Sequence, residues 1–215
     1  MTNTDQTWDK ALVLTSGGLD SAALLAHVNS LHMKEHITCL GIDYGQQGVK
    51  ELKYAELQAE YFGNTYRQVS AHLVPLKPPK PLMHEWDAYT PARNMFLATV
   101  AAHHAELLGC QLIYMALIDD GNFPDTSPAF VQAMQQVIWE STSHDMVLQT
   151  PLLHIRNKAQ LFHMLDKVGA FNIIKDTFSC WNGVSLLRPW GVGCQVCEKC
   201  KAKEQAWLDF TGAGQ

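Results

Sequence analysis

The chain has 215 residues, of which 47% are hydrophobic and 17% charged, and a formal net charge of −5 at pH 7. This length and composition suit one α/β domain with a small appendage. The negative charge provides no general attraction for nucleic acid or an anionic membrane surface, so we expect a small-molecule substrate and no direct nucleic-acid partner.

Nothing in the sequence indicates membrane insertion or export. No apolar run approaches the roughly 20 residues that cross a bilayer, and the start, Met1 to Lys10, lacks the basic and apolar parts of a signal peptide. We therefore expect a cytoplasmic protein without membrane contact. Because thiols stay reduced there, the six cysteines call for a metal or catalytic interpretation rather than disulfides.

Apolar β-prone stretches alternate with segments of helical period in the first third of the chain. The predicted elements are strand Ala11 to Leu14, helix Leu19 to Leu31, strand Ile37 to Ile42, helix Val49 to Phe62 and strand Tyr66 to Val69. This βαβαβ order predicts an open parallel sheet with helices on both faces.

A glycine turn joins the first predicted strand to the first helix. It consists of Thr15, Ser16, Gly17, Gly18, Leu19, Asp20 and Ser21. Glycines allow close backbone approach to a ligand, and the helix N-terminus favours negative charge, so the turn predicts a phosphate or pyrophosphate site. It has neither the lysine of a Walker A motif nor the third glycine of a dinucleotide fingerprint.

Asp20 would repel phosphate unless a cation lay between them, so we assign it to Mg²⁺. A bare Gly-Gly pair would more simply be a tight turn, with Asp20 a charge of the first helical turn. The whole string Ser16 to Ser21, however, resembles the signature of the PP-loop ATP pyrophosphatases. That resemblance implies an adenine nucleotide alpha hydrolase-like fold, cleavage of ATP between its α and β phosphates, and adenylation of a substrate.

The second predicted strand ends beside the same crevice, because ligands of open parallel sheets bind beyond the carboxyl ends of the strands. Its last residues are Asp43, Tyr44, Gly45 and Gln46. We place the adenine and ribose of ATP against them. For Asp43 and Tyr44 alone, a solvated strand-end turn is an equally good interpretation.

A proline-rich segment, His72 to Pro91, follows and is expected to be either a lid or a connector. The elements predicted after it are helix Met95 to Leu108, strand Leu112 to Leu117, helix Pro128 to Trp139, helix Lys158 to Val168 and a closing helix Lys201 to Phe210. We divide the chain into a nucleotide-binding domain, residues 1–176, and a zinc-binding segment, residues 177–215.

Four cysteines lie in that last segment. They are Cys180, Cys194, Cys197 and Cys200, and the last three have the spacing Cys-x-x-Cys-x-x-Cys. Four thiolates form the closed tetrahedral shell of structural Zn²⁺, so we expect zinc to fasten the tail and not to catalyse. An iron–sulfur cluster uses similar spacing, but nothing else in the sequence indicates redox chemistry.

The phosphate turn and the cysteine cluster together resemble the 7-cyano-7-deazaguanine synthase (QueC) family from about Ala11 to Trp207. Further matching strings are Asp43-Tyr44-Gly45-Gln46, Pro91-Ala92-Arg93-Asn94, Pro124-Asp125, Thr150-Pro151-Leu152, Lys158 and Ser179-Cys180-Trp181-Asn182-Gly183. The resemblance implies an ATP-dependent ligase that adenylates 7-carboxy-7-deazaguanine, forms an amide with ammonia, and dehydrates it to a nitrile after a second activation. It also suggests a homodimer.

Roles for other residues follow from that resemblance. Arg93 and Lys158 each open a helix and are expected to act beside Asp20 in catalysis, as cations facing phosphate or the substrate carboxylate. The alternative for both is a solvated charge. The expected substrate contacts are Asn94, Phe123, Asp125 and Trp181, and polar loop or packing roles are their alternatives.

The chain departs from the family pattern near the expected crevice. It has Gln47-Gly48 where the family has Arg-His, Asp120 to Phe123 where the family has Tyr-Ser-Gly-Tyr, and a longer gap between Cys180 and Cys194. Two alternatives therefore stay open. One is a paralogue that stops at the amide or transfers the acyl group to another amine, including a protein partner. The other is a non-catalytic nucleotide-binding zinc module.

Overall fold

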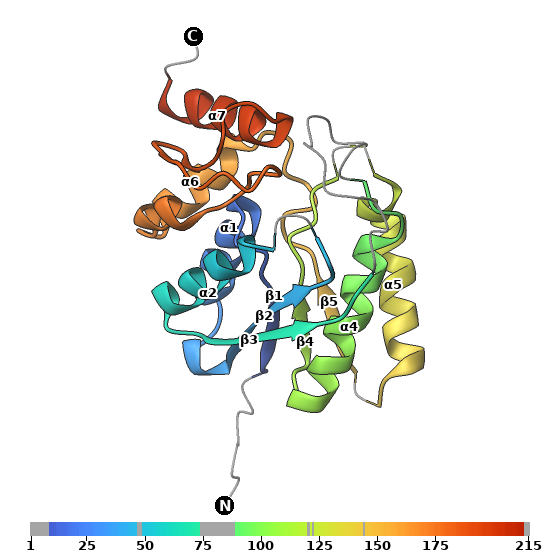
Figure 1. The fold of residues 1–215 in the computed structure, drawn as a ribbon. Coiled ribbons are helices and arrows are strands. Elements are labelled where there is room, and N and C mark those ends of the chain that lie inside the picture. Colours follow the sequence, from blue (N-terminus) through green and yellow to red (C-terminus); the bar gives the residue numbers. More distant parts are fainter. Residues whose placement is uncertain are drawn as a thin grey trace, which may run out of the picture.

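A computed structural model describes residues 9–46, 49–73, 89–119, 121, 123–143 and 145–212. At its centre is a parallel five-stranded sheet with the order β3-β2-β1-β4-β5 (Figure 1). Its strands are β1 (Ala11–Leu14), β2 (Ile37–Asp43), β3 (Thr65–Ser70), β4 (Leu112–Tyr114) and β5 (Val147–Gln149).

Helices cover both faces of the sheet. Those on one face are α1 (Leu19–Asn29), α2 (Glu51–Phe62) and α6 (Ala159–Lys167); those on the other are α4 (Arg93–Leu108) and α5 (Pro128–Ser141) (Figure 1). Two apolar clusters hold these layers together. Because successive strand residues point to opposite faces, Val13 belongs to the cluster under α1 and α6, and Leu12 to the cluster under α4 and α5.

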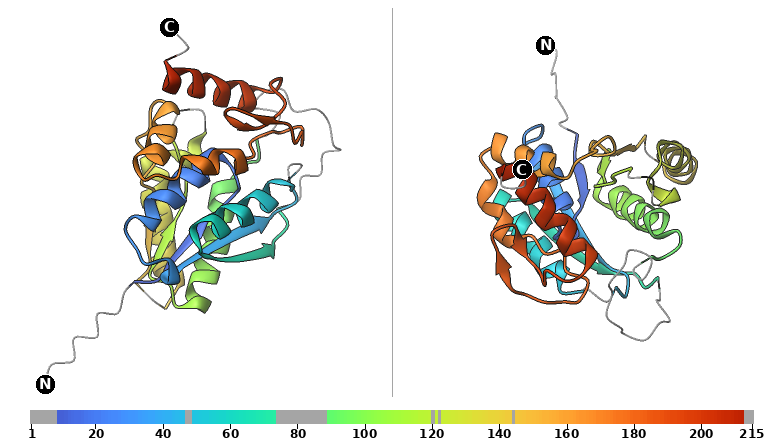
Figure 2. Two further views of the ribbon diagram at one scale, coloured as in Figure 1. Left: turned by 90° about the vertical axis from the view of Figure 1, so that its left-hand side faces the viewer. Right: turned by 90° about the horizontal axis from the view of Figure 1, so that it is seen from above.

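The C-terminal segment packs on the α1 and α6 side. Its elements are a two-stranded antiparallel ribbon of β6 (Leu187–Arg188) and β7 (Gly191–Val192), and helix α7 (Glu198–Thr211). Helix α7 lies next to α6 in both views of Figure 2. The Phe162 ring of α6 contacts Trp207 and Phe210 of α7, with centroids 5.4 Å and 5.8 Å apart. Buried residues of this segment share one apolar cluster with α1 and α6.

Short 3-10 helices complete the described part of the chain. They are η1 (Lys34–His36), η2 (Pro124–Thr126) and η3 (Phe171–Asp176). Within the described ranges, no helix combines the length and the apolar character that crossing a membrane requires.

The predicted α/β architecture with a parallel sheet and helices on both faces is confirmed. The strand predicted over Leu112 to Leu117 was too long, since β4 ends at Tyr114. Strand β5 was not predicted at all. Most of the proline-rich segment lies outside the described residues, as do residues 47 and 48, so its interpretation as a lid or a connector stays a prediction.

The strand order predicts where a ligand would bind to the sheet. The chain proceeds from β1 to β2 and β3 on one side, then crosses back to β4 on the other side of β1. The order therefore reverses between β1 and β4, and ligands of open α/β sheets bind beyond the carboxyl ends of strands at such a point. The glycine turn Thr15 to Ser21 leaves β1 there.

Candidate active site

Hydrogen bonds between two serines close the glycine turn. The Ser16 N–H donates to the Ser21 Oγ at 2.9 Å, and the two hydroxyl oxygens lie 3.0 Å apart. Ser21 is only 3% exposed, whereas Ser16 is exposed. The Thr15 N–H donates to the Leu40 carbonyl at 2.9 Å, which extends the β1–β2 pairing into the turn. The turn is thus anchored at both ends, and Ser16 is its exposed residue.

Gly17 permits the close packing of this turn against α2. It has a φ of +77°, and a Cβ atom on it would lie 2.2 Å from the Glu51 carbonyl oxygen and 2.8 Å from the Ala55 nitrogen. A side chain would therefore meet rigid backbone as well as backbone strain. On the other side, the Phe178 N–H donates to the Gly17 carbonyl at 2.8 Å.

The N–H groups of Gly18 and Leu19 remain available at the start of α1. In the described structure neither donates to a protein acceptor. The free N–H groups at a helix start, with the positive end of the helix dipole, favour an anion. Asp20 is half-buried. Because it lies in the first turn of α1, it is at the same end of the helix as these N–H donors.

The end of β2 forms its own hydrogen-bonded turn. The Asp43 carboxylate accepts from the Gly45 N–H at 3.0 Å, while the Gln46 amide accepts from the Tyr44 N–H at 2.9 Å and donates to the Ile42 carbonyl at 3.2 Å. The side chains of Asp43 and Gln46 thus shape the turn, and assignment of adenine and ribose to this segment stays a prediction.

Arg93 is the first residue of α4 and lies beside Tyr44. Burial raises the pKa of Tyr44, and the Arg93 guanidinium opposes that rise through its charge and a hydrogen bond. Ala92, which precedes Arg93, has a left-handed φ of 55°. Such a backbone conformation is costly for alanine and is retained only where the surroundings require it.

Glu51 was not predicted from the sequence, although it lies in this group. Burial raises the pKa of its carboxyl, while the charges of Lys199 and Arg93 and a hydrogen bond from Gln46 lower it. The Gln46 amide nitrogen lies 3.5 Å from the Glu51 carboxylate. Lys199 comes from the start of α7, so the C-terminal segment contributes a cation near the turn.

Two predicted substrate-binding residues contact each other. The Asp125 carboxylate accepts from the Asn94 backbone N–H at 2.9 Å, and the Asn94 amide donates to the Asp125 carbonyl at 3.1 Å. Asp125 therefore stabilises the start of α4, directly after Arg93. The Phe123 ring stacks on Tyr89 at 5.7 Å between centroids. Asp120 and Asn122 lie outside the described residues.

Lys158 and Trp181 occupy two other parts of the fold. Lys158 is the N-cap residue of α6 and is half-buried. Trp181, next to Cys180, is half-buried against the apolar cluster of α1 and α6. Their assigned roles stay predictions.

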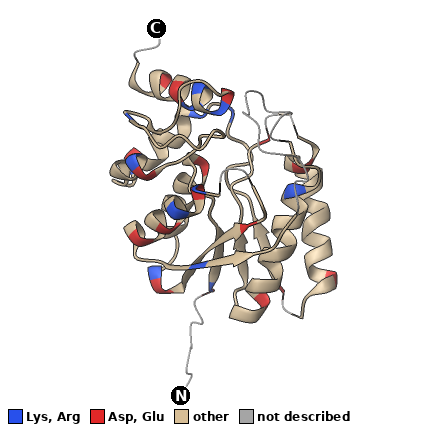
Figure 3. Cartoon of the chain, viewed as in Figure 1, with Lys and Arg blue, Asp and Glu red and all other residues tan. Residues whose placement is uncertain are grey.

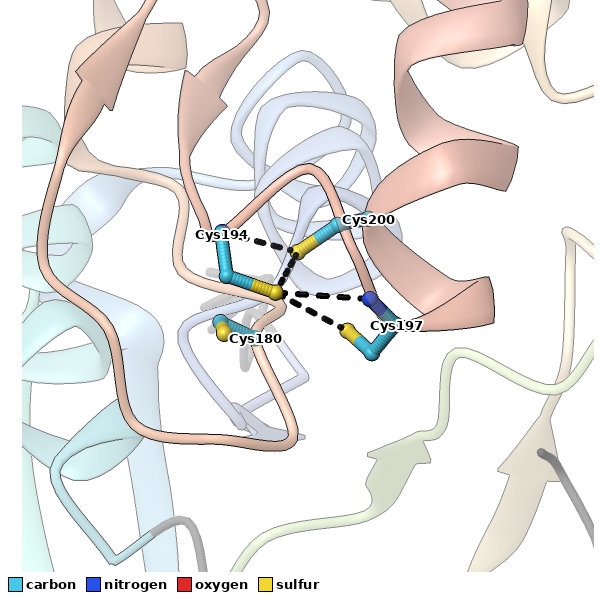
Figure 4. A group of neighbouring side chains, drawn as sticks. All are labelled: Cys180, Cys194, Cys197 and Cys200. Atoms are coloured by element: carbon cyan, nitrogen blue, oxygen red, sulfur yellow. Dashed lines mark hydrogen bonds between the residues drawn. The ribbon is translucent and has the colours of Figure 1, made fainter. Parts of the chain in front are cut away.

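The four predicted cysteines come together (Figure 4). Each offers a sulfur, and these sulfurs all lie within 4.8 Å of one another. The Cys194 sulfur is 3.6 Å from that of Cys197 and 3.9 Å from that of Cys200. Tetrahedral zinc with bonds of about 2.3 Å requires sulfurs about 3.8 Å apart, so the donor set fits this ion.

Backbone N–H groups donate to two of these sulfurs. The Cys194 N–H points at the Cys200 sulfur at 3.3 Å, and the N–H groups of Val196 and Cys197 point at the Cys194 sulfur at 3.3 and 3.4 Å. A hydrogen bond from the Cys200 thiol, with backbone donors, lowers the pKa of Cys197 to about 5. Such donors stabilise thiolates, the form that binds metal.

Lys203 of α7 is a buried lysine that interacts electrostatically with Cys200 of the cysteine cluster and with Asp20 of the glycine turn. It is 3% exposed and donates to the Thr177 carbonyl at 2.9 Å and to the Thr177 hydroxyl at 2.6 Å. Burial lowers its pKa to about 7, whereas the charges of Cys200 and Asp20 raise it. Charged residues of both signs line α7 (Figure 3), so nothing in the sequence pattern distinguishes this lysine from the others.

Known proteins resemble the chain over nearly its full length. A family profile described as "Queuosine biosynthesis protein QueC" matches residues 10–86 and 85–211. The 7-cyano-7-deazaguanine synthase of Magnetococcus marinus is 30% identical over 219 residues, covering 93% of this chain and 92% of that protein. The corresponding synthase of Phocaeicola vulgatus is 28% identical over 211 residues, covering 91% of each chain.

Solved structures show a more distant likeness. The U34-tRNA thiolase NcsA from Methanococcus maripaludis, solved with its [4Fe-4S] cluster, is 13% identical with a TM-score of 0.49. The match covers 95% of this chain and 70% of that chain.

Proposed function

The chain belongs to the QueC family of queuosine biosynthesis proteins, and on that basis we propose that it is an ATP-dependent carbon–nitrogen ligase, a 7-cyano-7-deazaguanine synthase. Its substrates are 7-carboxy-7-deazaguanine, ammonia and ATP. The structural observation that carries the proposal is the serine-closed glycine turn, which presents free N–H groups at the switch point of the sheet.

The chemistry requires an anion site of this kind. A carboxylate is a poor electrophile until one of its oxygens attacks the α phosphorus of ATP and becomes part of an AMP leaving group. Pyrophosphate departs in that step, and preorganised N–H donors stabilise its charge. Ammonia then displaces AMP to give the amide. A second adenylation, on the amide oxygen, lets AMP leave again as the nitrile forms.

Each residue of the site has a proposed role in binding ATP or the substrate. The N–H groups of Gly18 and Leu19 bind the pyrophosphate part of ATP, together with the hydroxyl of Ser16. Arg93 faces the α phosphate or the substrate carboxylate from the start of α4. The Asp125 carboxylate fixes the helix start by accepting from the N–H of the next residue, Asn94. Lys158, at the start of α6, is the second proposed cation. Tyr44, beside Arg93, belongs to the wall for the adenosine part of ATP.

Two metal ions complete the proposal. Asp20 lies next to the N–H donors and has the oxygen ligands that Mg²⁺ prefers, so it would hold the Mg²⁺ that neutralises phosphate charge. Cys180, Cys194, Cys197 and Cys200 would hold structural Zn²⁺, because four sulfurs leave no open position for water. We further propose that the enzyme is a homodimer in the cytoplasm.

One assay tests the proposed function. The zinc-loaded protein is incubated with 7-carboxy-7-deazaguanine, ATP, Mg²⁺ and ammonium, and the products are weighed by mass spectrometry. We expect the nitrile together with AMP. Accumulation of the amide would instead support the paralogue that stops at that stage, and absence of AMP with any amine donor would contradict the ligase assignment.

A further inference from the structure

Gln58, a fully buried polar residue, sits on the core-facing side of α2. It is 0% exposed, and the neighbouring inward positions of the helix are Leu52, Ala55 and Ala59. A buried amide costs free energy unless it is hydrogen-bonded. The amide nitrogen of Gln58 therefore needs hydrogen-bond acceptors on this apolar face of the helix.

Those partners are backbone carbonyls of the phosphate turn. The Gln58 amide nitrogen donates to the Gly17 carbonyl at 2.9 Å, to the Gly18 carbonyl at 3.3 Å and to the Asp176 carbonyl at 3.1 Å. Three acceptors around one nitrogen fix the orientation of the amide, because the reversed amide would place its oxygen against three carbonyl oxygens. Gln58 thus binds both glycines of the turn at once.

The hydrogen bonds from Gln58 to these carbonyls also fix the direction in which the N–H groups of the following residues point. In a planar trans peptide the carbonyl of one residue and the N–H of the next point to opposite sides. When the Gly17 and Gly18 carbonyls face Gln58, the N–H groups of Gly18 and Leu19 point away from α2. Neither of these two N–H groups donates to a protein acceptor in the described structure.

We propose that Gln58 is a positioning residue for the phosphate turn: it orients the Gly17–Gly18 and Gly18–Leu19 peptide planes so that their N–H groups bind the pyrophosphate part of ATP. This inference rests on the proposed function, because it assigns the turn to ATP. Glycine makes the support necessary, since each of these peptides contains at least one glycine, whose backbone is conformationally permissive. The helix supplies the rigidity that the glycines lack.

The test compares Gln58→Met with Asn64→Leu. Methionine keeps the length of glutamine and removes the donors. Asn64 is a matched control: it follows the C-terminal end of α2, is 8% exposed, and donates to Asn29 at 3.0 Å and to the Lys34 carbonyl at 3.3 Å. Both substitutions remove a buried amide, but only the first removes it from the phosphate turn.

Binding of magnesium pyrophosphate is measured by calorimetry, without any deazaguanine, and is followed by steady-state kinetics. We expect Gln58→Met to weaken pyrophosphate binding about tenfold and to raise KM for ATP by a similar factor, the loss of about one well-oriented hydrogen bond. Asn64→Leu is expected to lower the melting temperature and leave both constants unchanged. A purely structural role for Gln58 would reduce the fraction of active protein, hence the apparent kcat, without changing KM.

Wild-type affinity for pyrophosphate in Gln58→Met would overturn the proposal. If that variant does not fold, Gln58→Asn, which retracts the amide by one methylene, replaces it: weaker binding supports the proposal and unchanged binding overturns it. A wild-type protein that binds pyrophosphate but makes no AMP would contradict the proposed function alone, because the affinities of the variants would still decide the role of Gln58.

Discussion

The ammonium group of Lys203 donates to both oxygens of Thr177, at 2.9 Å to the carbonyl and at 2.6 Å to the hydroxyl. The next residue, Phe178, donates its N–H to the Gly17 carbonyl. A short chain of hydrogen bonds therefore leads from α7, which carries the last cysteine, to the phosphate turn. The C-terminal segment that carries the cysteine cluster thus also contacts the residues that support the turn.

Replacement of Lys203 tests its effect on the metal. The buried ammonium lies within electrostatic reach of the Cys200 thiolate, and a nearby positive charge favours the thiolates that bind zinc. We expect Lys203→Met to lower zinc affinity by about tenfold in competition with a chelator, the effect of about 1.4 kcal/mol. Lys201→Met, on the exposed side of the same helix, is the control. Equal losses in both variants would contradict this electrostatic role.

Removal of zinc is expected to loosen the C-terminal segment first. Without the metal, α7 loses the constraint at Cys197 and Cys200 but keeps its apolar contacts with α6. Hydrogen exchange during chelation should increase in residues 191–211 while β1, β2 and β4 stay protected. Simultaneous loss of protection in the central strands would show that the ion stabilises the whole fold.

The two glycines of the turn should respond differently to alanine. At Gly17 a Cβ would meet the Glu51 carbonyl oxygen at 2.2 Å with a φ of +77°, so we expect Gly17→Ala to cost about 1–3 kcal/mol of stability and to abolish ATP binding. Gly18 has a φ of −80°, and its nearest contact would be 3.5 Å. Gly18→Ala should keep the folded state within about 1 kcal/mol. Denaturant unfolding and ATP titration of both variants test this order, and the reverse order would contradict the geometry of the turn.

Asp20→Asn removes the charge assigned to Mg²⁺ and keeps the size of the side chain. We expect a loss of about 100-fold or more in turnover, comparable with the loss of a charge-stabilising group. Zinc content and the circular dichroism spectrum should be unchanged. Turnover equal to that of the wild type would remove Asp20 from the active site.

The parts of this fold that depend on local pattern could be predicted from the sequence. Alternation of apolar and helical segments predicted the parallel sheet, and cysteine spacing predicted a four-sulfur group that the structure brings within 4.8 Å. Strand β5 was missed because its three residues, Val147–Gln149, are too few to show a period of two. Its pairing with β4 supplies the stability that its own sequence does not reveal.

The supporting contacts of the candidate site were missed for a different reason. Gln58 and Lys203 act on Gly17, Gly18 and Thr177 across large sequence separations, and no local spacing encodes such contacts. A partial signal exists for Gln58, because a glutamine interrupts the apolar face of an otherwise regular helix. Lys203 gave no such signal, since lysine is ordinary on a helix with many charged residues.

The route of oxygen from the substrate carboxylate tests the central claim most directly. With 7-carboxy-7-deazaguanine labelled with ¹⁸O at both carboxylate oxygens, each adenylation transfers one labelled oxygen to the AMP that leaves. Mass spectrometry of the nucleotides should therefore find ¹⁸O in AMP after amide formation and again after nitrile formation, and none in pyrophosphate. Label in inorganic phosphate with formation of ADP, or AMP without label, would contradict adenylation at the phosphate turn.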